Sequence, residues 1–175
     1  MTVKKMDIDT LKTLSKNEIP SLARKLSAED VNFLVTTLAE KDDTLRYNAF
    51  LLLQANSRQF PLVYQHWSEL EKKLESSNSY QRSIGLMLIA ENVRWDKEGK
   101  FQKTIDTYLN CCTDEKFITA RQAIQGLASI VKATSEYDGK IKQGLSGLPL
   151  DKYKENQQKL LRKDVANVIK IVDRK

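Results

Sequence analysis

Residues 113–127, TDEKFITARQAIQGL, contain the pattern that decides the fold. A polar turn leads into a helical segment that carries Arg121 near its start. Arg46 and Arg82 occupy the same place in two earlier segments, and 36 and 39 residues separate the successive arginines. Each arginine has a leucine twelve positions before it (Leu34, Leu70, Leu109) and another six positions after it (Leu52, Leu88, Leu127). Three copies with the same offsets predict a repeated structural unit.

The residues around these markers have the periodicity of helices rather than of strands. Ser27 with Asp30 forms a capping-box pattern at one predicted helix start. The apolar residues after it follow three-and-four spacing: Val31, Leu34, Val35 and Leu38. We therefore expect an all-α chain of about ten helices. Their predicted ranges are 7–15, 19–26, 28–41, 44–58, 61–76, 79–93, 99–112, 117–133, 139–147 and 152–172.

In its repeat length, polar turns and early arginines, the chain resembles the HEAT and armadillo class of α-solenoid proteins. The stretch 113–121 is similar to the turn between the two helices of a HEAT repeat. The resemblance implies a right-handed α-solenoid (an α-α superhelix) of about four HEAT-like repeats, forming a single domain over 1–175. Within it we expect N-terminal capping helices over 1–27, three HEAT-like repeats over 28–140, and a degenerate basic C-terminal capping repeat over 141–175.

The composition favours a folded chain that does not enter a membrane. Of the 175 residues, 41% are hydrophobic, and there are only 6 Gly and 3 Pro. Such a chain is too apolar to be disordered and too poor in Gly and Pro to be a linker. No apolar run approaches the roughly 18 residues that span a bilayer, and the N-terminus lacks the apolar stretch of a secretory signal. We therefore expect a cytoplasmic protein.

Few residues are suited to chemistry. His66 is the one histidine, and Cys111 and Cys112 are adjacent, which suits neither a zinc site nor a CxxC redox motif. The glycines at 144 and 147 lack the spacing of a phosphate-binding loop. We expect no metal ion and no small-molecule cofactor, and the interpretation leans towards a protein without catalytic activity.

The positive charge is concentrated at the C-terminal end. The net charge is +6, and residues 140–175, with ten basic and four acidic side chains, account for all of it. Two interpretations stay open at this point. The basic segment is either a patch that contacts phosphates or an acidic partner, or an ordinary solvated helix face.

The repeated arginines also have two interpretations. Arg46, Arg82 and Arg121 either brace the stack as a ladder, each pairing with an acid or carbonyl of a neighbouring repeat, or form a basic stripe along a groove. The resemblance to HEAT repeats favours the ladder. An acid-paired ladder would count against nucleic-acid binding.

A second repeated pattern gives candidate partner-binding residues. Asn56 with Arg58, and Asn92 with Arg94, have the form Asn-x-Arg 36 residues apart, and Trp95 follows directly. Arginine presents a planar fork to carboxylates, and an exposed aromatic beside it suits a protein hot spot or base stacking. In armadillo repeats, similarly regular asparagines bind extended peptide. Alternatively, Asn and Arg are simply favourable near helix C-termini.

We expect a HEAT-like scaffold that binds a protein or peptide partner through its concave groove. The alternative is a nucleic-acid-binding protein related in fold to DNA alkylation repair glycosylases, contacting nucleic acid through residues 140–175. Trp95 with Asp96 is the nearest counterpart of the glycosylase site, but no catalytic residue is carried over. A third possibility gives the apolar face of helix 152–172 a docking role, whereas in the plainer interpretation that face seals the last repeat.

Overall fold

The computed structural model describes residues 5–175. Over these residues the chain forms ten α-helices and four short 3-10 segments and contains no strand, so the all-α prediction is confirmed. The chain divides into two compact units at Glu69 and Leu70. The predicted organisation as one domain with three sections stays a prediction. No helix of the described residues has the length and apolar character needed to cross a bilayer.

In the first unit, helix α4 is the central element. It packs against three shorter helices, and a 3-10 segment follows it. The bounds are α1 (Ile8–Thr13), α2 (Ile19–Ala23), α3 (Ala28–Thr37), α4 (Asp43–Ser57) and the 3-10 segment Val63–His66. Leucine side chains supply much of the core, including Leu11, Leu34, Leu52 and Leu53, all with no exposed surface. Helix α5 (Trp67–Lys73) crosses the boundary between the units.

The predicted capping box at the start of α3 is confirmed. The Ser27 N–H donates to Asp30 Oδ2 at 2.9 Å, and the Asp30 N–H donates to Ser27 Oγ at 3.1 Å. The Met6 N–H donates to the other carboxylate oxygen at 2.9 Å. Burial by itself would raise the pKa of Asp30, but these hydrogen bonds bring that pKa below its ordinary value.

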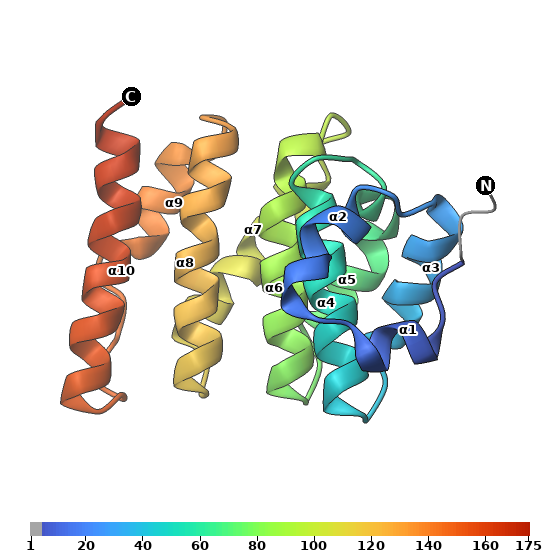
Figure 1. Ribbon diagram of the computed structural model, residues 1–175. Coiled ribbons are helices and arrows are strands. Elements are labelled where there is room, and N and C mark those ends of the chain that lie inside the picture. Colours follow the sequence, from blue (N-terminus) through green and yellow to red (C-terminus); the bar gives the residue numbers. More distant parts are fainter. Residues whose placement is uncertain (1–4) are drawn as a thin grey trace. The chain divides into compact units, whose positions relative to one another are not determined.

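The second unit is built on three helices that lie side by side, with α8 packed against both α6 and α10 (Figure 1). Its bounds are α6 (Ser79–Asn92), α7 (Lys100–Asn110), α8 (Phe117–Ala133), α9 (Asp138–Leu145) and α10 (Glu155–Asp173), with 3-10 segments at Val93–Trp95 and Cys111–Thr113.

Contacts at both ends show that α6, α8 and α10 run parallel. Ser83 Oγ lies 3.0 Å from Thr119 Oγ1 near the starts of α6 and α8. The rings of Phe117 and Tyr153 meet edge to face, with centroids 6.4 Å apart, near the starts of α8 and α10. Beyond the other ends of α8 and α10, Lys175 Nζ donates to the Thr134 carbonyl at 3.1 Å. The starts of the three helices therefore lie at the same end of the second unit.

Gly126 of α8 leaves room for the Tyr108 side chain of α7. The buried Tyr108 hydroxyl of α7 donates to the Ala123 carbonyl of α8 at 3.0 Å. A Cβ at Gly126 would lie 2.2 Å from that hydroxyl and 3.1 Å from Cβ of Ala90 in α6. A larger residue at position 126 would therefore overlap neighbours from both α7 and α6.

Several predicted helix boundaries are wrong. The helices predicted over 19–26 and 28–41 end early, at Ala23 and Thr37. The helix expected over 61–76 is instead a 3-10 turn that starts at Val63 and is followed by α5. Tyr64 of the turn packs edge to face on Trp67 of α5, with ring centroids 5.7 Å apart. The last helix begins at Glu155 rather than near 152, because the Tyr153 N–H donates to the Leu150 carbonyl and closes a turn. Apolar spacing does not register either of these tight turns.

We predict that Gly126→Ala lowers the free energy of unfolding by about 1–3 kcal/mol, because the new methyl group overlaps the Tyr108 hydroxyl. In a Tyr108→Phe background the same substitution should cost less. Gly139→Ala is the matched control, because it lies inside α9 with nothing within 4 Å of its Cβ position. It should be neutral or stabilise by up to about 1 kcal/mol. Equal costs at the two glycines in urea denaturation would contradict this account.

Candidate functional site

Arg82 connects α6 to the turn that precedes α8. Its Nε donates to Asp114 Oδ2 at 2.7 Å and its Nη2 donates to Asp114 Oδ1 at 2.8 Å, a two-pronged pair in which both side chains are largely buried. Its Nη1 donates to the Ser76 carbonyl at 2.9 Å. One guanidinium therefore holds its own preceding turn and the turn of the next helical pair.

Arg121 links α8 to the middle of α10 rather than to the turn before it. Its Nε donates to Asp164 Oδ2 of α10 at 2.8 Å, and Gln125 donates to the other carboxylate oxygen at 3.3 Å. Arg46, in the first unit, bonds within its own turn, donating to the Glu40 carbonyl at 3.1 Å and pairing with Asp43. In the second unit the arginines thus reach from one helical pair to the next.

The ion pair between Arg82 and Asp114 shifts the pKa of both side chains. Burial by itself would raise the pKa of Asp114, but the Arg82 hydrogen bonds and the Lys116 N–H bring that pKa below its ordinary value of 3.8. The hydrogen bonds to Asp114 raise the pKa of Arg82. Because the folded state holds the carboxylate charged, this contribution to stability is present at neutral pH and is lost in acid as Asp114 becomes protonated.

The two asparagines of the Asn-x-Arg pattern are completely buried. Asn56 Nδ2 donates to the Ala23 carbonyl at 2.9 Å and so joins α4 to α2. Asn92 Nδ2 donates to the Leu88 carbonyl at 2.8 Å within α6. These amide groups therefore face the protein interior and bond its main chain, where a partner does not reach them.

The other predicted partner-binding residues are accessible to different degrees. Arg58 is exposed at the C-terminus of α4, in the first unit. In the second unit, Arg94 Nη2 bonds Glu91 Oε2 at 2.9 Å, and Trp95 is partly exposed. Asp96, beside Trp95, accepts hydrogen bonds from the first main-chain N–H groups of α7 at 2.9 and 2.8 Å, so its carboxylate caps that helix. The partner-binding role of Arg58, Arg94 and Trp95 stays a prediction.

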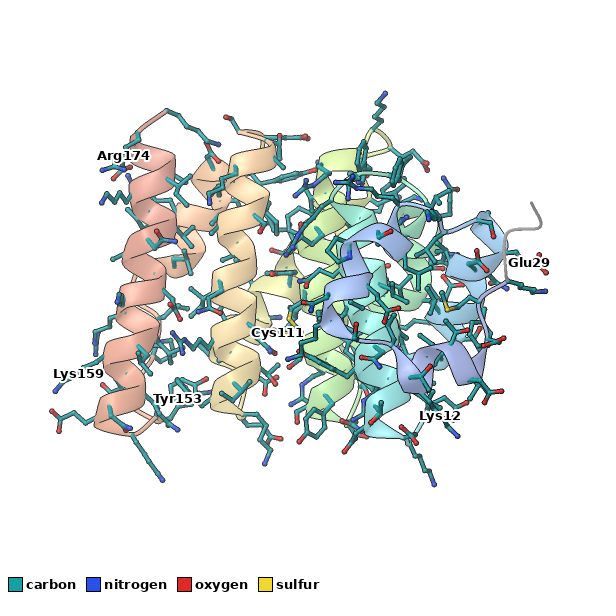
Figure 2. The ribbon with its side chains drawn as sticks, in the orientation of Figure 1. Lys12, Glu29, Cys111, Tyr153, Lys159 and Arg174 are labelled. Atoms are coloured by element: carbon teal, nitrogen blue, oxygen red, sulfur yellow. The ribbon has the colours of Figure 1, made fainter. Side chains whose placement is uncertain are left out.

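A groove of about 500 Å³ lies at the starts of α6, α8 and α10 in the second unit. We call it the N-terminal groove. Its lining comes from three segments: Ser79, Tyr80 and Ser83; residues 115–119; and residues 152–154 with Gln157. Figure 2 shows Tyr153 between the starts of α8 and α10. The lining combines apolar side chains, such as Tyr80 and Ile118, with the lysines Lys116, Lys152 and Lys154.

Sequence reasoning missed this groove, although two signals pointed to it. Lys116 and Lys154 occupy the N-cap positions of α8 and α10, where Ser, Thr, Asp or Asn is usual. Tyr80 and Ile118 stand at similar places near the starts of α6 and α8 and are exposed. A contact surface at the starts of these helices would explain both the lysines at the N-cap positions and the exposed apolar side chains.

The basic C-terminal segment is partly neutralised. Lys140 pairs with Asp106 at 2.8 Å and Lys175 with Asp138 at 2.9 Å. Lys142 and Lys159 also form ion pairs. Among the described residues the other six basic side chains of this segment form none: Lys152, Lys154, Arg162, Lys163, Lys170 and Arg174. Part of the charge thus braces α9 and α10, and part stays solvated on the surface.

The residue types best suited to catalysis or metal binding are either close to another charged side chain or buried. His66 Nδ1 lies 3.8 Å from Glu69 Oε1. Both cysteines are buried thiols; burial raises the pKa of Cys111 to about 11 and that of Cys112 to about 12. Across residues 5–175 no group of three or more His, Cys, Asp and Glu side chains is placed to hold a metal ion.

No protein-family model matches the chain, and no curated protein matches it closely enough to be called a relative.

We predict strong coupling between Arg82 and Asp114 in a double-mutant cycle. Arg82→Ala should lower the free energy of unfolding by about 2–4 kcal/mol, because it leaves a buried carboxylate uncompensated. The coupling energy with Asp114→Ala should exceed about 1 kcal/mol. The exposed pair Lys159–Glu155 is the control and should couple by under about 0.5 kcal/mol. Equal coupling in the two cycles would show that the ladder contributes nothing special.

We also predict that the cysteines of the native protein resist a thiol reagent at pH 8. With pKa values of about 11 and about 12, their reactive thiolate fraction is on the order of 10⁻³ or less. Reaction with Ellman's reagent should be at least about 100-fold slower than in a denaturing concentration of guanidinium chloride. Labelling of the native protein at the denatured rate would mean that Cys111 or Cys112 is accessible.

Proposed function

We propose that this protein is a non-catalytic, HEAT-like helical-repeat scaffold that binds a protein or peptide partner. The observation that carries the proposal is the parallel stack of α6, α8 and α10, with Arg82–Asp114 and Arg121–Asp164 linking successive helical pairs. Proteins built from such repeats use the surface made by equivalent helices as a binding face. The groove along the starts of these helices supports the same conclusion.

The engagement of the polar side chains supports binding rather than catalysis. Asp96 caps α7, both cysteines are buried, and Glu91 bonds Arg94. The carboxylate beside Trp95, which is the nearest counterpart of a glycosylase acid, is thus used for folding. The alternative, nucleic-acid binding, loses support because Arg82 and Arg121 are paired with acids. What favours it is the solvated charge on α10.

A selection from a random peptide display library against the whole chain tests the proposed function. The selection should enrich sequences that bind with micromolar affinity or better, typical of a module that recognises short segments. Failure to enrich any binder over repeated rounds would contradict the proposal.

Nucleic-acid binding is tested by fluorescence anisotropy with labelled duplex DNA and single-stranded RNA at about 50 and 200 mM salt. The proposed function predicts no tight binding at either concentration. Tight binding at low salt that falls about 10³-fold or more at the higher salt would mean that several phosphates are contacted. That result would favour the nucleic-acid alternative.

A further inference from the structure

The N-terminal groove presents apolar side chains to solvent. Tyr80 is 67% exposed and Ile118 is 58% exposed, whereas Leu160, the other exposed large apolar side chain of residues 70–175, is 36% exposed. Tyr80 belongs to the first turn of α6 and Ile118 to the first turn of α8, and both line the same cavity. Exposed apolar side chains that gather at a cavity indicate a contact surface for a partner.

The floor of the groove is fixed before any partner arrives. Ser83 and Thr119, both buried, are joined by a hydrogen bond of 3.0 Å between α6 and α8. The edge-to-face contact of Phe117 with Tyr153 holds the start of α10 against α8. A preformed groove loses little conformational entropy on binding, so more of the contact energy contributes to affinity.

The groove is positively charged. Lys116, Lys152 and Lys154 line it, opposed by the single acid Glu115. Lys152 donates to the Thr113 carbonyl, and within residues 5–175 neither Lys116 nor Lys154 forms an ion pair. These two lysines are the N-cap residues of α8 and α10, and the positive ends of the two helix dipoles add to the positive electrostatic potential of the groove. A ligand that complements the groove therefore carries negative charge around an apolar group.

From this combination we propose that the N-terminal groove binds an acidic peptide segment that carries an aliphatic or aromatic side chain. The apolar side chain packs beside Tyr80 and Ile118, and carboxylates on either side of it lie near Lys116 and Lys154. The inference rests on the proposed function, since it names the surface and the chemistry of the partner. A nucleic acid suits the groove less well, because no arginine lines it and Arg82, two residues after Tyr80, is held by Asp114.

The test measures two things: the composition of the selected peptides, and their affinity for variants with substitutions inside and outside the groove. Peptides enriched on the unmodified chain should combine Asp or Glu with one large apolar residue. Their affinity should fall about tenfold or more for Lys116→Glu/Lys154→Glu and also for Ile118→Asp. Lys163→Glu/Lys170→Glu is the matched control: it makes the same change in net charge on exposed residues of α10 outside the groove, and it should leave the affinity unchanged.

The groove variants should fold, because the three side chains are exposed and a glutamate at a helix N-terminus is favourable; circular dichroism checks this. Two results would overturn the proposal for the groove but not the proposed scaffold function. The selected peptides would not be acidic, or they would bind Lys116→Glu/Lys154→Glu as tightly as the unmodified chain. A selection that yields no binder overturns both proposals. Nucleic-acid binding abolished by Lys116→Glu/Lys154→Glu would assign the groove to phosphates and overturn the peptide proposal.

Discussion

The ion pair between Arg82 and Asp114 is the interaction on which the second unit depends. Both side chains are largely buried, so neither charge is well solvated without the other. Around the same aspartate, three segments meet: Arg82 comes from α6, the Lys116 N–H bonds the carboxylate at the start of α8, and the Tyr153 hydroxyl donates to the Asp114 carbonyl just before α10. One turn thus positions the starts of three parallel helices.

The candidate site follows from this constraint. Lys116, Lys152 and Tyr153 line the N-terminal groove, and each donates a hydrogen bond to Asp114 or Thr113. The contacts that stack the helices therefore also set the shape and the charge of the proposed peptide surface. In this proposal the scaffold and the binding face are parts of one arrangement.

The sequence predicted the helices well where a repeat or a cap encoded them. The range 117–133 matches α8 at both ends, and the Ser27–Asp30 box begins α3 as expected. The prediction failed where tertiary contacts determine the backbone conformation. The turn at Tyr153 makes α10 begin later than predicted, and the spacing of apolar residues does not reveal that Tyr153 packs against the Phe117 ring. Asn92 illustrates the limit for sites. Its spacing suggests a repeated surface amide, but whether an amide at a helix end faces solvent or the interior depends on neighbouring helices, and here it is buried.

Hydrogen exchange of the unmodified chain and of Asp114→Asn, followed by mass spectrometry, tests the central claim that one turn holds three helices. The account predicts that this substitution speeds exchange together in residues 79–85, 117–121 and 153–160, although only the second of these segments adjoins Asp114 in sequence. Faster exchange confined to residues 111–121 would contradict it, because the turn would then support α8 alone.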